Sequence, residues 1–295
     1  MVRFPRFLVR GDRVALVAPS SPFDASEFDA ARARLSRDFD VRVSADVGAR
    51  DDYLAGSDTH RRLELQAALD DERVAAVIAV RGGYGAGRIA GCLDPKRFEA
   101  SPKWIAGFSD ITVLHAWAQR LGIASLHAPN AGGAGRLEDD ARSLVDSLCG
   151  RVATRRWPVR SFRTFSPVEG LAAGGNLTVT TFEALSGRLP SMRGRVLFLE
   201  DVGERIYRVD RMLSALVDGG FFIGLQAIVL GHFTRCDGTE AGRTVSTLAR
   251  ELEDRIGVPV VHGAPFGHEA PNEPFVQGAR VCVDTDAVTL SMTEG

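Results

Sequence analysis

Continuous apolar segments alternate with amphipathic segments through the first half of this chain, and this alternation limits its fold more than any other feature. Residues 14–19 (VALVAP) and 74–80 (VAAVIAV) carry no polar residue at alternate positions, which is typical of strands buried on both faces. Residues 24–35, which open with capping-box spacing, and residues 58–71 have the pattern of helices, and residues 41–45 that of a second strand. Buried strands separated by helices predict an α/β fold with a parallel sheet.

The same alternation continues to about residue 150 and returns in the second half. KWIAGF (103–108) and IASLHA (123–128) are expected strands on either side of a helix over 110–121, and residues 138–150 have the pattern of a further helix. In the second half we expect four strand-forming segments, 195–201, 227–233, 258–263 and 280–292, and two helices, 205–217 and 240–256.

A basic, proline-punctuated segment separates the two halves. We predict an N-terminal α/β domain over residues 1–150, a linker over 151–170 and a C-terminal domain over 171–295. The arginines of the linker are expected to be solvated rather than to bind nucleic acid.

Composition and charge exclude several classes of protein. With 45% hydrophobic and 25% charged residues, the 295-residue chain has the composition of a soluble globular protein. A formal net charge of −2 gives no basis for docking on nucleic acid or anionic lipid. The apolar segments are too short to span a bilayer and the N-terminus has no signal-peptide pattern, so we expect a cytoplasmic protein. Its four cysteines are expected to be free thiols: Cys92, Cys149, Cys236 and Cys282.

A serine lies in a tight turn between an expected strand and an expected helix. In GFSD (107–110), Ser109 follows a glycine and precedes Asp110, which is the layout of a nucleophile elbow. Such a turn holds the hydroxyl clear of the sheet and offers backbone N–H groups to an oxyanion. The motif G-x-S-x-G is incomplete, because Ile111 replaces the last glycine. A second interpretation is that Ser109 or Asp110 caps the helix.

A serine nucleophile needs a histidine base and a carboxylate that orients it. Of the six histidines, His268 lies in a loop rich in glycine and proline, GAPFGHEAPNEPFVQG, where catalytic side chains collect in α/β proteins. Glu200 directly follows the apolar segment RVLFL and is the sharpest carboxylate candidate. Its alternative is a solvated turn residue.

The glycine-rich segment RGGYGAGR (81–88) follows the second long apolar strand. Its backbone N–H groups suit an oxyanion donor, a substrate-binding turn or a phosphate cradle. It does not match the dinucleotide pattern G-x-G-x-x-G, so we predict no cofactor. His232 and Cys236 are four residues apart, but no paired-ligand pattern completes a zinc site, so we predict no metal.

Six segments in this order resemble the signature of the LD-carboxypeptidase family of serine peptidases. That family includes the murein tetrapeptide carboxypeptidases and the microcin C immunity peptidases. The similarity extends over nearly the whole chain, from Gly11 to beyond Pro274, and rests on these segments: YLAGSD (53–58), RGGYGAGR (81–88), GFSDITVLH (107–115), GGNLTV (174–179), FLEDVGERIYRVDRML (198–213) and GHEAPNEPF (267–275).

The resemblance implies a catalytic triad of Ser109 as nucleophile, Glu200 as orienting carboxylate and His268 as base. It implies backbone oxyanion donors at Asp110 and at a glycine of RGGYG, which we assign to Gly83. It also implies a flavodoxin-like N-terminal domain with a parallel sheet, a smaller mixed α/β C-terminal domain, and a homodimer.

The implied function is hydrolysis of the L,D bond that releases terminal D-alanine from a murein tetrapeptide, a step of peptidoglycan recycling. The first alternative is an immunity peptidase that cleaves an aminoacyl or peptidyl adenylate. For that alternative an adenine-stacking aromatic is expected, and Trp157 is the tryptophan outside the predicted core elements. The second alternative is a non-catalytic small-molecule binding protein on the same scaffold.

Several residues near the motifs are candidates for substrate binding. Arginine binds a terminal carboxylate in bidentate geometry, and Glu204 suits the amine of diaminopimelate or, alternatively, serves as a charge at a helix start. After the histidine loop, relatives tend to read Leu-Pro-Leu-Gly, whereas this chain has Phe275-Val-Gln-Gly278. The remaining candidates are Arg81, Tyr84, Arg88, Arg205 and Arg208.

Overall fold

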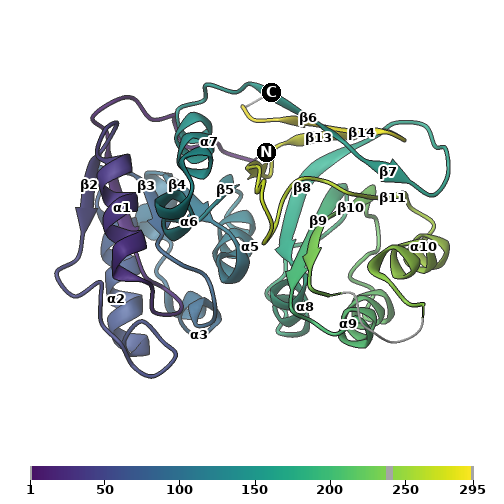
Figure 1. Ribbon diagram of the computed structural model, residues 1–295, viewed down its shortest axis with the longest axis horizontal. Helices are drawn as coiled ribbons and strands as arrows, with labels where there is room; N and C mark the ends of the chain where they lie inside the picture. Colours follow the sequence, from purple (N-terminus) through teal and green to yellow (C-terminus); the bar gives the residue numbers. More distant parts are fainter. Residues whose placement is uncertain (1, 237–241, 294–295) are drawn as a thin grey trace. The chain divides into compact units, whose positions relative to one another are not determined.

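The computed structural model describes residues 2–236 and 242–293, and the chain divides into two compact units (Figure 1). The first unit comprises Met1–Val152 and Glu273–Val276. The second comprises Ala153–Asn272 and Gln277–Gly295 and is the smaller of the two. The chain therefore returns to the first unit for one short segment close to its C-terminal end.

The first unit is built on a largely parallel sheet. Among the described residues six strands form it, in the order β12-β5-β4-β3-β1-β2. The pairs β1–β2, β1–β3, β3–β4 and β4–β5 are all parallel. The order 2-1-3-4-5 is that of a flavodoxin-like doubly wound sheet, as predicted. The strands are β1 (Arg13–Val17), β2 (Asp40–Val43), β3 (Val74–Ala79), β4 (Trp104–Gly107), β5 (Ser125–His127) and β12 (Phe275–Gln277).

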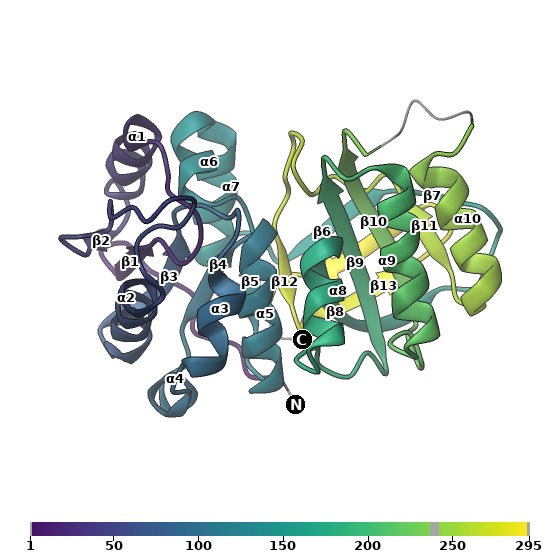
Figure 2. The ribbon, with the colours of Figure 1, turned by 90° about the horizontal axis from the view of Figure 1, so that it is seen from below.

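Helices cover both faces of this sheet, which explains its continuous apolar strands: every residue of β3 is buried. Figure 2 shows α1, α6 and α7 on one face and α2, α3, α4 and α5 on the other. The helices are α1 (Ala25–Leu35), α2 (Asp58–Asp70), α3 (Ala86–Ile89), α4 (Lys96–Ala100), α5 (Thr112–Arg120), α6 (Ala131–Arg136) and α7 (Glu138–Leu148), with short 3₁₀ turns η1 (Ala90–Cys92) and η2 (Ser109–Ile111).

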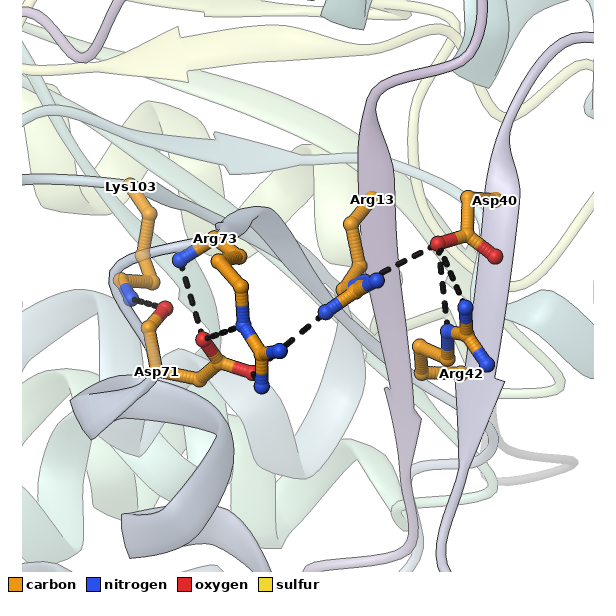
Figure 3. Close-up of polar contacts among 6 residues, drawn as sticks. All are labelled: Arg13, Asp40, Arg42, Asp71, Arg73 and Lys103. Carbon is orange, nitrogen blue, oxygen red and sulfur yellow. Dashed lines mark hydrogen bonds and ion pairs between the residues drawn. The ribbon is translucent and has the colours of Figure 1, made fainter.

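Charged side chains form a network where the parallel strands begin (Figure 3). Arg13, the first residue of β1, lies 3.0 Å from Asp40 and 3.9 Å from Asp71. The hydrogen bonds from Arg73 lower the pKa of Asp71 to about 2, and Lys103 donates to the Asp71 carbonyl at 2.6 Å. Because parallel strands begin at one edge, this network occupies the amino edge of the sheet, and the loops after β1, β3 and β4 share the opposite edge.

The second unit contains a mixed sheet with helices on one face. Among the described residues eight strands form it, in the order β6-β14-β13-β8-β9-β10-β11-β7, with a parallel centre and antiparallel edges. Helices α8, α9 and α10 lie side by side on it (Figure 2). The strands are β6 (Thr154–Pro158), β7 (Arg160–Ser161), β8 (Val168–Asn176), β9 (Arg195–Val202), β10 (Ala227–Thr234), β11 (Val260–His262), β13 (Arg280–Val283) and β14 (Ala287–Ser291), and the helices are α8 (Leu177–Leu185), α9 (Ile206–Asp218) and α10 (Val245–Ile256).

Some expectations differ from the structure in detail. Residues 151–170, expected as a linker, hold β6, β7 and the first residues of β8. Of the helix expected over 240–256, residues 240 and 241 lie outside the described residues, and α10 begins at Val245. All four cysteines are free thiols. In the part of the chain that the structure describes, every helix is too short or too polar to traverse a lipid bilayer.

Candidate active site

Ser109 occupies a sharp turn between β4 and α5. Its φ is +65°, in the left-handed region that residues other than glycine rarely adopt. Neither Ser109 nor Asp110 is the N-cap of the helix that follows: Phe108 occupies that position for η2 and Ile111 for α5, in both cases without a side-chain cap bond. A positive φ at a serine between a strand and a helix is the backbone of a nucleophile elbow.

Buried polar side chains fix the backbone on the strand side of this turn. The carbonyl of Gly107 accepts a hydrogen bond from Nε2 of His115 at 2.9 Å, and Ser125 Oγ lies 2.8 Å from Nδ1 of the same ring. Because a carbonyl only accepts, Nε2 carries the proton and Nδ1 accepts from the Ser125 hydroxyl. Complete burial lowers the pKa of His115 to about 4, so this ring is neutral at neutral pH. The Phe108 N–H donates to Asn130 Oδ1 at 3.1 Å.

The glycine-rich loop after β3 lies directly against Ser109. A Cβ on Gly82 would be 2.8 Å from the Ser109 Cβ and 3.0 Å from its Oγ, so a side chain at this position would press on the hydroxyl. The next residue, Gly83, has φ +103°, and a Cβ there would be 2.4 Å from Ser21 Oγ. The loop therefore needs glycine at both positions to approach Ser109 and the turn after β1 this closely.

Glu200 and His268, 68 positions apart in the sequence, form a hydrogen-bonded pair in the second unit. His268 Nδ1 lies 2.6 Å from Glu200 Oε2; the carboxylate side chain is fully buried and the imidazole is 19% exposed. Burial raises the pKa of Glu200, and the hydrogen bond from His268 opposes that shift by favouring the ionised carboxylate. Glu200 is therefore not the solvated turn residue of the alternative interpretation.

Two neighbouring residues, Asn176 and Gly267, lie against Glu200. Asn176, opposite Glu200 in the β8–β9 register, donates from Nδ2 to Asp201 at 3.0 Å and to Glu200 Oε1 at 3.4 Å. Its Oδ1 accepts from the Val179 N–H at 3.1 Å, so both ends of the amide are engaged. Asn176 lies in the GGNLTV segment, whose role the sequence did not reveal. Gly267, with φ +125°, would place a Cβ 3.0 Å from Glu200 Oε2.

The substrate-binding candidates lie at the surface of their units. Arg81 donates to the Pro22 carbonyl at 2.6 Å. Tyr84 is 52% exposed, and its ring centroid lies 6.0 Å from that of Tyr53. Arg208 pairs with Glu204 at 3.4 Å, one turn apart at the start of α9. Two further candidates lie elsewhere in the structure. Arg88 forms an ion pair with Asp58, and Arg205 is the N-cap residue of α9.

One expectation about the aromatic residues is wrong. Trp157 lies in β6 and is 1% exposed, stacked on Phe266 with ring centroids 5.8 Å apart. The basic residues around Trp157 predict a linker, whereas pairing of β6 with β14 places the indole in the core. A buried ring of this kind is not accessible to an adenine. Among the described residues no group of three or more His, Cys, Asp or Glu is arranged to hold a metal ion.

Comparison with known proteins identifies the family to which this chain belongs. Residues 14–128 match the LD-carboxypeptidase N-terminal domain, and residues 169–283 match the LD-carboxypeptidase C-terminal domain. The chain belongs to the LD-carboxypeptidase family, as the resemblance of its motifs predicted.

Individual relatives extend over nearly the whole chain. A putative carboxypeptidase of Streptomyces coelicolor is 38% identical, covering 97% of this chain and 95% of that protein. The murein tetrapeptide carboxypeptidase of Pseudomonas aeruginosa is 35% identical, over 90% of this chain and 91% of that one. The crystal structure of muramoyltetrapeptide carboxypeptidase from Oxalobacter formigenes superimposes with a TM-score of 0.85 at 28% identity, covering 94% and 97% of the two chains.

The fold is also shared with a more distant protein. The microcin C7 self immunity protein MccF, in its wild-type apo state, superimposes with a TM-score of 0.88 at 21% identity, covering 99% of this chain and 98% of that one. At this identity the similarity concerns the fold alone.

Proposed function

We propose that this protein is a serine carboxypeptidase that releases terminal D-alanine from the L-centre of a murein tetrapeptide. The observation that carries the proposal is the buried Glu200–His268 hydrogen bond of 2.6 Å, together with a serine in a strand–turn–helix elbow. A fully buried carboxylate bonded to a partly exposed imidazole is the arrangement that an activated serine requires. The murein peptidases among the relatives support the substrate class.

In the proposed mechanism Ser109 attacks the scissile carbonyl while His268 accepts its proton. Nδ1 of His268 faces Glu200, so Nε2 is the nitrogen that takes part in proton transfer. Glu200 holds the ring and stabilises the imidazolium that forms, and His268 then returns the proton to the leaving amine of D-alanine. Water hydrolyses the resulting acyl-enzyme by the same steps. The proposal requires Ser109 of the first unit and His268 of the second to meet during catalysis.

We assign the oxyanion donors to the backbone N–H groups of Asp110 and Gly83. The packing of Gly82 against Ser109 supports a donor in this loop, because the next N–H along the chain belongs to Gly83. Each donor contributes about 3 kcal/mol of transition-state stabilisation in enzymes of this kind. For substrate binding we propose that Arg81 binds the terminal carboxylate with Tyr84 beside it, and that Glu204, paired with Arg208, binds the amine of diaminopimelate.

The proposal includes the cytoplasmic location expected from the apolar segments and the N-terminus, and the homodimeric state that the resemblance implies. A peptidase of murein recycling acts on peptides inside the cell, where no disulfide is needed, and the four thiols are free. Light scattering of the purified chain measures the oligomeric state directly.

Product analysis separates the proposed substrate from the alternatives. The protein is incubated with a disaccharide-tetrapeptide and, separately, with an aminoacyl-sulfamoyl adenosine, and the products are identified by mass spectrometry. We expect D-alanine release from the first, no cleavage of the second, and no cleavage by Ser109→Ala. Cleavage of the adenosine compound alone would favour the immunity-peptidase alternative. Cleavage of neither would favour the binding-protein alternative.

A further inference from the structure

We propose that Ser20 and Ser21, in the turn after β1, are positioning residues that aim the two oxyanion donors. This inference rests on the proposed function, since it concerns the Asp110 and Gly83 N–H groups assigned there. In the sequence, PSSP (19–22) reads only as a turn. In the structure each of its two serines holds one of the two segments that carry the donors.

The first serine acts on the elbow. Ser20 is fully buried, and its Oγ donates to Asp110 Oδ2 at 2.6 Å. The same carboxylate oxygen accepts from the Ala86 N–H at 2.8 Å, at the start of α3. The side chain of Asp110 therefore links the elbow to the turn after β1 and to the end of the glycine-rich loop. Because Asp110 directly follows a residue with a strained backbone, its peptide plane depends on this anchor.

The second serine acts on the glycine-rich loop. The Ser21 N–H donates to the Gly82 carbonyl at 3.2 Å, and Ser21 Oγ accepts from the Tyr84 N–H at 3.1 Å. The two bonds lie on either side of Gly83. In a trans peptide the C=O and the N–H point in opposite directions, so fixing the Gly82 carbonyl toward Ser21 directs the Gly83 N–H away from the turn. The Ser21 backbone thus orients the peptide that carries the proposed donor, and the Ser21 hydroxyl fixes the next N–H of the same segment, that of Tyr84.

The turn after β1 is itself held by hydrogen bonds from α2 and from the segment that precedes α2. Arg61 of α2 is fully buried and donates to the Pro19 carbonyl at 2.5 Å and to the Gly56 carbonyl at 3.2 Å. The Ala55 N–H donates to the Ser20 carbonyl at 2.9 Å. Through these bonds the YLAGSD segment (53–58), which carries none of the residues proposed for catalysis, holds the turn after β1 in place. We call the turn with Ser20 and Ser21 the brace. It can position other groups only if its own backbone is fixed, and hydrogen bonds to two successive carbonyls, those of Pro19 and Ser20, fix it.

The position in the fold fits this assignment. β1 and β3 are adjacent strands, and the direction in which the chain adds strands to the sheet reverses between them. In doubly wound folds, ligands bind at this switch point, outside the carboxyl ends of the strands. The turn after β1 and the loop after β3 follow the two strands at this place. Neither serine needs to touch substrate for this role, so we expect kcat to fall and KM to stay nearly constant when a hydroxyl is removed.

The test measures how fast, and to what extent, a fluorophosphonate labels Ser109, because that reaction places an oxygen in the oxyanion site. The variants are Ser20→Ala, Ser21→Ala and Ser21→Thr, which retains Oγ. The matched control is Ser26→Ala, whose hydroxyl donates to Asp24 on the surface. We expect roughly tenfold slower labelling in both alanine variants at a full stoichiometry of one label per chain, as part of the 10²–10³ lost with a whole donor. Ser21→Thr and Ser26→Ala should label at nearly the wild-type rate, and kcat for the peptide should follow the labelling rate.

The other outcomes overturn the inference in distinguishable ways. If wild type is labelled at Ser109 and the alanine variants react equally fast, the brace is wrong and the proposed function stands. If the alanine variants show reduced stoichiometry at an unchanged rate, the serines support folding only. If Ser21→Thr is as slow as Ser21→Ala, the Oγ bond to Tyr84 is not the cause. If wild type is not labelled at all, the proposed function and the brace both fail.

Discussion

Ser109 adopts a positive φ although it is not glycine, which costs about 1–2 kcal/mol in an L-residue. The structure holds this conformation by hydrogen bonds on each side: His115 and Asn130 engage the residues before the serine, and Ser20 engages Asp110 after it. All three partners are buried, so their hydrogen bonds are not exchanged with water. A strained residue that the surroundings over-determine is typical of a functional site.

His115 gives this region a measurable pH dependence. Its pKa of about 4 in the folded protein lies below the value of 6.5 for an unfolded chain, so the unfolded state binds more protons at intermediate pH. The contribution to stability is fully present above pH 6.5 and is lost as pH falls toward 4. Between pH 7 and pH 5 the loss from this one group is about 2 kcal/mol.

Urea denaturation at both pH values checks this prediction. We expect the unfolding free energy of wild type to fall by about 2 kcal/mol more between pH 7 and pH 5 than that of His115→Gln, which does not titrate. An equal fall in both proteins would show that His115 is not buried as a neutral ring.

Among the elements, β9 connects the core of the second unit to the proposed catalytic pair of Glu200 and His268. Its residues from 196 to 201 are all buried, and the strand ends where Glu200 meets His268. Leu197 belongs to the cluster that α8, α9 and α10 bury against the sheet. The strand therefore positions Glu200 by the packing of its apolar residues, not by contacts of the carboxylate alone.

A pair of leucine substitutions tests how strongly this packing stabilises the unit. Leu197→Ala removes a fully buried side chain, and we expect it to lower the unfolding free energy by 2–5 kcal/mol. Leu185→Ala, at a residue 63% exposed at the end of α8, should change it by less than about 0.5 kcal/mol. Similar values for the two variants, measured by denaturant titration, would contradict the burial assigned to β9.

The elements that sequence patterns predicted well are those with a clear apolar period. Their continuous apolar residues correctly predicted the buried strands β1, β3, β9 and β10. In contrast, α6 (AGGAGR) was not predicted, because glycine disfavours helices in isolation. The structure supplies the reason for this composition: a Cβ on Gly135 would lie 2.0 Å from the Glu27 carbonyl oxygen of α1. Close packing of two helices determines α6, and local propensity does not report on such packing.

At the scale of the whole molecule, the residues proposed for catalysis are distributed over two units. These residues were predicted from the order of the family motifs along the sequence, because no local spacing links Ser109 to Glu200 or His268. Positioning residues were beyond reach for the same reason: Ser20 and Asp110 are 90 positions apart, and Asn176 contacts Glu200 across 24. Such pairs are created by the strand order, which places loops distant in sequence at one edge of a sheet.

Ser109 and His268 are proposed to act as one catalytic unit, and a double-mutant comparison of D-alanine release measures whether they depend on each other. Members of a triad depend on one another, so removing either abolishes what the other contributes. We predict that Ser109→Ala and His268→Ala each lower kcat by a similar factor, on the order of 10⁴–10⁶, and that the double variant is no slower than the singles. A double variant whose loss is the product of the two single losses, or a single variant that keeps near wild-type turnover, would show that the two residues do not form one catalytic unit.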